Sequence, residues 1–222
     1  MNYGLIKDVL DLVQEFEIET NNNNHFETSI EGFKNWISTN NNTVVNEPDW
    51  EGKENGRSAE SVINTLIVHM NRYAKSYSKS AIVGSDFSTQ EDFIYLINLK
   101  AFGEMSKMDL IKKNVHEKPV GMQIINRLIN QGWIEQRNSK IDKRSKVISI
   151  SETGLQELEN LMDKIRQATS IVTGNLSQNE KMELIRLLHK LDDFHQPIYD
   201  RNIETEDLLR EALTFKIEKN EK

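Results

Sequence analysis

The chain has 222 residues, of which 37% are hydrophobic and 28% are charged, a composition typical of a globular protein with a polar surface. It contains no cysteine, which excludes a disulfide framework, a cysteine-ligated zinc site and a thiol redox sensor. Its net charge of −7 argues against a protein that coats nucleic acid indiscriminately.

The first 57 residues predict a helical extension followed by a polar connector. Apolar residues recur at helical spacing from Leu5 to Phe16 and from Phe26 to Ile37, with asparagine-rich breaks at 21–24 and 40–42. The stretch NEPDWEGKENG (46–56) has the polar, Pro- and Gly-containing composition of a connector. The N-terminus is acidic and lacks the basic region of a secretory signal, and no apolar run reaches the ~18 residues of a membrane span. We therefore expect a cytoplasmic protein without a membrane partner.

Residues 58–131 and 177–195 predict a series of helices. Ser58 precedes an apolar stripe from Val62 to Tyr77, which predicts a helix over about 58–83. Three S-x-x-acid capping boxes predict later helix starts, because the hydroxyl accepts a free amide and the acid bonds back to the cap. They are Ser88 with Glu91, Ser106 with Asp109 and Ser177 with Glu180, for helices at about 89–102, 107–113 and 178–195. A further helix over about 117–131 stops at Gly132.

A β-hairpin is predicted directly after this helix. WIEQR (133–137) and KVISIS (146–151) are strand-like runs on either side of a polar loop, and Ser151 then begins another long helix. Apolar spacing over 203–218 predicts a last helix. A short helix, a turn and a second helix followed by a two-stranded hairpin is the order of a winged helix-turn-helix, whose second helix enters the DNA major groove. We therefore expect a mostly α fold with a winged helix-turn-helix over about 88–151 and a two-stranded β wing.

Basic residues concentrate in the same part of the chain. Between Lys100 and Lys146, eleven Lys and Arg stand against five acids, a net charge of +6, so the rest of the chain carries −13. A basic segment in an acidic protein indicates a surface for a polyanion. Chance clustering of charges on a solvated helix face is the alternative interpretation.

Three motifs lie within residues 105–154. They are Leu128 followed by Gly132-Trp133-Ile134, then Asp142-x-Arg144 at the wing tip, then Ser151-x-x-Gly154 at the next helix start. In these motifs the chain resembles the MarR family (multiple-antibiotic-resistance regulators) of bacterial winged-helix transcription factors, and residues 176–191 resemble its penultimate helix. The resemblance covers about 58–200 and implies a homodimer held by helices over about 58–83 and 152–196. Residues 1–57, the N-terminal helical extension with its connector, and 201–222, the C-terminal helix, have no counterpart in the family pattern.

The candidate DNA-contacting surfaces are the exposed face of the second helix and the wing. Gln123 and Asn126 have the donor–acceptor pair that adenine requires, and Lys118 suits guanine or phosphate. Arg144 is expected to enter the minor groove while Asp142 holds its guanidinium. A solvated helix face and a local salt bridge in a surface turn are the alternatives. The candidate residues are Lys118, Pro119, Met122, Gln123, Asn126, Arg127, Lys140, Asp142, Lys143, Arg144 and Lys146, with Ile124, Ile125 and Leu128 in the core.

The resemblance also implies a small ligand, often aromatic or anionic, between the dimerisation and DNA-binding parts. Candidate ligand contacts are Tyr73, Tyr77, Phe87 and Trp133, for which core packing is the alternative. The expected partners are therefore double-stranded DNA with a palindromic operator, a second copy of the chain and such a ligand.

The sequence predicts neither an enzyme nor a metalloprotein. The five histidines lack metal-ligand spacing, since His189 and His195 are separated by six positions. No phosphate-binding glycine loop, nucleophile elbow or nucleotide fingerprint occurs, so no cofactor is expected. A second hypothesis is a winged-helix interaction or scaffold module without operator binding, because Val120-Gly121-Met122 stands where the family usually has small polar residues.

Overall fold

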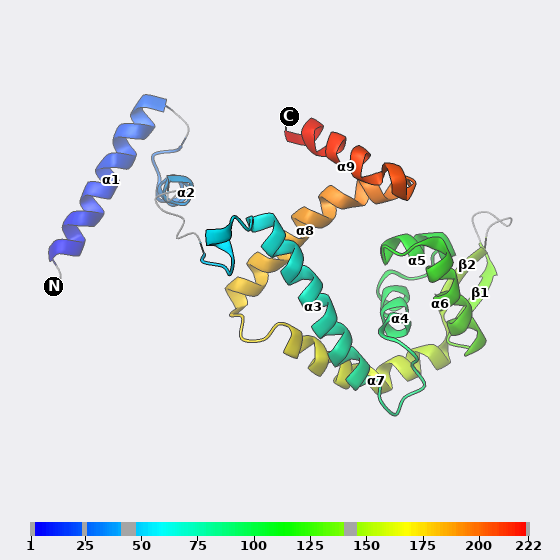
Figure 1. The fold of residues 1–222 in the computed structure, drawn as a ribbon. Coiled ribbons are helices and arrows are strands. Elements are labelled where there is room, and N and C mark those ends of the chain that lie inside the picture. Colours follow the sequence, from blue (N-terminus) through cyan, green and yellow to red (C-terminus); the bar gives the residue numbers. More distant parts are fainter. Residues whose placement is uncertain (1–2, 24–25, 41–47, 140–145, 221–222) are drawn as a thin grey trace. The chain divides into compact units, whose positions relative to one another are not determined.

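The computed structural model describes residues 3–23, 26–40, 48–139 and 146–220 (Figure 1). The elements in chain order are α1 (Tyr3–Asn23), α2 (Ile30–Asn40), the 3₁₀ turn η1 (Lys53–Asn55), α3 (Ala59–Ala81), α4 (Gln90–Phe102), α5 (Lys107–Lys113), α6 (Lys118–Asn130), β1 (Ile134–Asn138), β2 (Lys146–Ile150), α7 (Glu152–Val172), α8 (Gln178–Asp200) and α9 (Thr205–Asn220). The predicted fold class is confirmed, because the chain is mostly helical with a two-stranded antiparallel sheet. The chain divides into two compact units, Met1–Ile63 and Asn64–Lys222.

In the N-terminal unit, α1 and α2 pack through aromatic side chains. Phe16 and Trp36 are buried, and the Phe16 ring centroid lies 5.3 Å from that of Phe33. The indole Nε1 of Trp36 donates a hydrogen bond to the Glu19 carboxylate at 2.8 Å. The predicted break at 21–24 is placed too early, because α1 continues to Asn23 and its side chains are buried as late as Thr20.

The second unit contains a compact group formed by α4, α5, α6 and the β-hairpin, drawn in green in Figure 1, which we call the reading head (residues 90–150). Its core includes Tyr95, Leu99 and Leu110, each nearly or fully buried. The predicted core positions of α6 are confirmed, since Ile124, Ile125 and Leu128 are all buried in the same cluster. Helix α7 adds Leu158, Leu161 and Ile165 to this core and packs against α4.

Local capping explains where most of these helices begin. The hydroxyls of Ser106, Ser151 and Ser177 each accept a backbone amide three residues on, as the S-x-x pattern requires. The capping box of α4 differs from the prediction by one residue, since it is formed by Thr89 and Asp92. The cause is a tertiary one. The Asp92 carboxylate is fully buried, so it must be satisfied by hydrogen bonds within the protein, and one of these comes from the Thr89 amide at the helix start.

The hairpin has a register that brings Asn138 opposite Lys146, Gln136 opposite Ile148 and Ile134 opposite Ile150. Directly opposed residues share one face of a sheet, so this face runs from the buried Ile134 outward to Lys146. The free edge of β2 carries a third segment, because Met105 and Ile148 exchange backbone hydrogen bonds of 3.1 and 2.8 Å. This bridge joins the start of α5 to the base of the wing.

Helix α8 is longer than the predicted 178–195, since it continues to Asp200 with Pro197 inside it. Helix α9 packs against it through the rings of Phe194 and Phe215, whose centroids are 5.5 Å apart. Several apolar side chains of α3 and α8 remain about half exposed. They include Leu66, Ile67 and Tyr73 on α3 and Met182, Ile185 and Leu188 on α8. Over the described ranges, no helix combines the length and hydrophobicity needed to span a bilayer.

Candidate nucleic-acid interface

The two helices of the reading head that carry the candidate site approach each other closely. Gly121 is buried, and a Cβ atom at this position would lie 2.4 Å from Cγ1 of Ile111 on α5. The glycine is therefore required by the α5–α6 contact and faces the core, which gives a packing reason for one of the three residues that depart from the family pattern. In the intervening turn, Val115 adopts a positive φ of 52° and the Asn98 amide donates to the Asn114 side chain at 2.9 Å.

The exposed face of α6 carries four of the six predicted recognition residues. Lys118, Pro119, Gln123 and Asn126 are exposed, with Pro119 in the first turn where its missing amide costs no helical hydrogen bond. Met122 is only partly exposed and packs against the core, so it is better placed to support the helix than to contact DNA. The structure thus brings a cation and two amide side chains onto one solvent-facing surface.

Arg127 differs from the prediction that it lies free on this face. Its side chain is 33% exposed, and its Nε donates to Oδ1 of the fully buried Asp92 at 3.0 Å. The other carboxylate oxygen of Asp92 accepts the amides of Ser88 and Thr89 at 2.8 and 3.1 Å. Arg127 therefore ties α6 to the start of α4, and this ion pair explains why the capping box is shifted.

The wing is described at its base but not at its tip. Lys146, at the start of β2, is exposed as predicted. Lys140, Asp142, Lys143 and Arg144 lie outside the described residues, so their contact with DNA stays a prediction.

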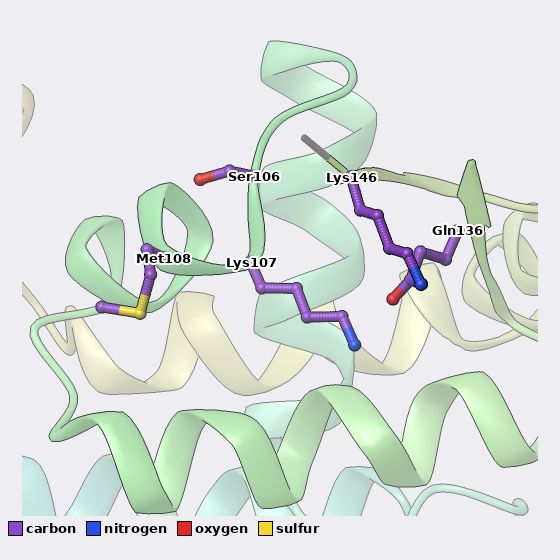
Figure 2. Close-up of a pocket in the computed structure, with 5 residues that line it drawn as sticks. All are labelled: Ser106, Lys107, Met108, Gln136 and Lys146. Carbon is purple, nitrogen blue, oxygen red and sulfur yellow. The ribbon is translucent and has the colours of Figure 1, made fainter. Parts of the chain in front are cut away.

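A hollow of about 390 Å³ lies at the base of the wing, between the start of α5 and the hairpin. We call it the wing-base hollow; it is lined by Ser106, Lys107, Met108, Gln136 and Lys146. Figure 2 shows the side chains of Lys107, Lys146 and Gln136 extending toward the same space from separate segments. Lys107 and Gln136 were not singled out from the sequence, because neither belongs to a motif and the Met105–Ile148 bridge that assembles the hollow is not encoded locally.

The helix-turn-helix is also anchored to the end of α8. The Tyr199 hydroxyl donates to the backbone carbonyl of His116 at 2.7 Å, and Lys112 forms an ion pair of 3.1 Å with Asp200. The ring of His116 lies 2.8 Å, Nδ1 to oxygen, from the buried Tyr95 hydroxyl. Burial raises the pKa of Tyr95, with the Glu91 charge adding to the rise, so this hydroxyl stays protonated. These contacts connect the turn before α6 to a long helix outside the reading head.

The four candidate ligand contacts occupy different environments. Phe87 and Trp133 are buried with ring centroids 4.5 Å apart, so the two rings pack against each other in the core. Tyr73 and Tyr77 lie on α3 and are 55% and 38% exposed. Their contact with a ligand stays a prediction. No cluster of three or more histidine, aspartate or glutamate side chains suited to a metal ion occurs among the residues that the structure describes.

Comparison with known proteins identifies the fold. No protein-family model matches the sequence. A curated relative, the HTH-type transcriptional repressor NicR of Pseudomonas putida, is 25% identical over 105 residues. The match covers 47% of this chain and 66% of the repressor, just under two thirds of its length.

Two solved structures have the same architecture. A cysteine-to-serine variant of MarR from E. coli in complex with operator DNA superposes with a TM-score of 0.54 at 19% identity, covering 65% of this chain and 99% of that protein. BpsR of Bordetella bronchiseptica, whose DNA binding is regulated by 6-hydroxynicotinic acid, gives a TM-score of 0.53 at 20% identity, covering 59% and 98%. The resemblance predicted from the wing and helix motifs is thus confirmed at the level of structure, and the chain has the winged-helix fold of the MarR-family transcriptional regulators.

Proposed function

We propose that this protein is a sequence-specific DNA-binding transcriptional regulator without enzymatic activity. The observation that carries the proposal is the exposed surface of α6, where Lys118, Gln123 and Asn126 face solvent. The sequence of the following hairpin loop adds Lys140, Lys143 and Arg144. Amide side chains that are free of intramolecular bonds among the described residues suit bidentate pairing with adenine, and the lysine suits guanine or a phosphate. In this proposal α6 enters the major groove and the wing lies along the flanking DNA.

The proposed regulator acts as a homodimer through α3 and α8. These helices leave side chains such as Leu66, Ile67, Ile185 and Leu188 between 47% and 54% exposed. Contiguous exposed apolar surface on a soluble chain marks an interaction site, and its burial against a second copy is favourable by about 25 cal/mol per Å². Two-fold symmetry of the protein would then require a palindromic operator with half-sites about one helical turn, roughly 34 Å, apart.

A small aromatic or anionic molecule is proposed to shift the operator affinity. The similarity to BpsR, which is regulated by 6-hydroxynicotinic acid, supports this class of effector. The anchoring of the helix-turn-helix to α8 through Tyr199 and Lys112 provides a physical connection along which a change in α8 would move the reading head.

Selection of bound sequences from random DNA, followed by titration of the selected site at several salt concentrations, tests the proposal. A regulator should select a palindrome and bind it with a steep salt dependence, because each neutralised phosphate releases counterions. Asn126→Ala should reduce discrimination at one base pair of each half-site by about 1–3 kcal/mol. Gln156→Ala, an exposed amide on α7, is the matched control and should leave discrimination unchanged. Absence of any saturable binding at low salt would overturn the regulator and favour the interaction module.

A further inference from the structure

We propose that the wing-base hollow is a binding site for a single phosphate group, held by Lys107 and Lys146 with Gln136 as a hydrogen-bonding partner. Where the bound phosphate belongs to the operator backbone, this inference rests on the proposed function. None of the three residues belongs to the exposed face of α6, so the site adds a contact that is separate from base recognition.

The backbone explains why two lysines from different segments come together. Met105 pairs with Ile148 in antiparallel orientation on the free edge of β2. Lys107, the first residue of α5, lies two positions after Met105, and Lys146, the first residue of β2, lies two positions before Ile148, so the bridge holds the two segments together where both lysines line the hollow. Figure 2 shows both side chains continuing toward the same space.

The charge balance of the hollow indicates an anionic occupant. Two like charges that line the same hollow repel each other. Within the ranges that the structure describes, neither Lys107 nor Lys146 forms an ion pair with a carboxylate. The nearby acid Glu104 is already paired with Arg137, and residues 135 and 137 alternate onto the sheet face opposite Gln136. Asp109, a second acid beside the hollow, accepts the Ser106 hydroxyl at 2.7 Å, so among the described residues neither nearby carboxylate is paired with Lys107 or Lys146. The two lysines therefore favour an anion supplied from outside.

The chemistry and the open shape of the hollow suit a phosphate group that stays partly in solvent. Gln136 lies diagonally across the strand pair from Lys146 and presents an amide that can donate to a phosphate oxygen. The hollow of about 390 Å³ is open to solvent, with Met108 providing an apolar wall, so a phosphate that is part of a polymer can enter it. Lysine binds phosphate as a point charge and does not require a fixed bidentate geometry. The same features would also accept free inorganic phosphate, and the experiment separates these two sources.

The test compares the full-length parent with the double variant Lys107→Gln/Lys146→Gln on the selected operator. Loss of one phosphate contact should reduce the slope of log K against log salt concentration by about 0.9 per bound chain. Lys164→Gln, an exposed lysine on α7, is the matched control and should leave the slope unchanged, while Lys107→Arg/Lys146→Arg should retain the parent slope. In ethylation interference, one phosphate per half-site whose ethylation blocks binding of the parent should no longer do so for the double variant.

A second arm uses inorganic phosphate without DNA, at constant ionic strength with chloride as the reference. Saturable phosphate-dependent shifts of the Gln136 side-chain amide in the NMR spectrum, absent in the double variant, would support the site with free phosphate as the occupant. A reduced salt slope without such shifts would support it with the DNA backbone as the occupant. An unchanged slope together with no phosphate-dependent shift would overturn the inference. If the parent selects no DNA, the proposed function fails while this arm still decides the phosphate site.

Discussion

Replacing Arg127 with alanine should destabilise the reading head, because it leaves the Asp92 carboxylate buried without its counter-charge. The Asp92 side chain is 0% exposed and receives the Arg127 Nε at 3.0 Å. Removing one partner of a buried ion pair costs about 3–5 kcal/mol. Since the Arg127 side chain is 33% exposed, water reaches the pair, and the lower end of about 3 kcal/mol applies. For a chain of this size, that corresponds to a fall in Tm of about 6–12 °C.

Urea denaturation followed by far-UV circular dichroism measures this cost. Arg137→Ala is the matched control, because its ion pair with Glu104 is exposed on both sides, at 48% and 39%, and should contribute no more than about 1 kcal/mol. The double variant Asp92→Ala/Arg127→Ala should be more stable than the sum of the two single variants predicts, since it removes the unpaired buried charge.

Two outcomes would refute this reasoning. Equal denaturation midpoints for Arg127→Ala and Arg137→Ala would show that burial of Asp92 carries no penalty. An unchanged midpoint combined with a selective loss of operator affinity would return Arg127 to the DNA-contacting face on which the sequence placed it.

Three further predictions concern packing, capping and assembly. Gly121→Ala should lower the free energy of unfolding by about 1 kcal/mol, because overpacking against Ile111 costs about 1–3 kcal/mol and the gain in helix propensity returns about 1 kcal/mol. A double-mutant cycle with Ile111→Ala should show a favourable coupling, and additive costs would contradict the contact. Ser177→Ala should raise the pKa of Glu180 toward its ordinary value in an NMR titration, since the Ser177 hydrogen bonds hold it low. Because that folded-state pKa is depressed, the associated stability is present above the unfolded pKa and lost as pH falls through the folded one, so the difference in stability between parent and variant should shrink in acid. Ile185→Glu, on the exposed apolar face of α8, should convert a dimer to a monomer in sedimentation, and an unchanged mass would exclude this face from the interface.

Much of the secondary structure could be predicted because its determinants are local. The hydroxyls at Ser106, Ser151 and Ser177 accept amides within the same turn, so the sequence alone indicates where α5, α7 and α8 begin. Helical spacing likewise placed Ile124, Ile125 and Leu128 of α6 toward the core. The order of these elements was sufficient to predict the winged-helix fold.

Tertiary contacts decided what the spacing left open. Periodicity assigns a residue to a face of a helix but does not name what that face meets. The sequence therefore predicted Arg127 as an exposed recognition residue, because its partner Asp92 lies 35 positions earlier and spacing does not reveal such a pair. Gly121 stood out in the sequence only as a departure from the family pattern, although the closeness of Ile111 is what requires a glycine there.

The wing-base hollow and the contact of Tyr199 with His116 depend on segments that only the fold brings together. Tyr199 and His116 are 83 positions apart, and the backbone bridge between Met105 and Ile148 holds the segment before Lys107 beside the strand that begins at Lys146. Such contacts depend on the three-dimensional path of the chain, because a backbone bridge involves no particular side chain and leaves no motif in the sequence. The sequence by itself therefore determined the elements, their order and the basic character of the reading head, and the tertiary structure decided which of its charged side chains are held by the protein and which are free to meet a partner.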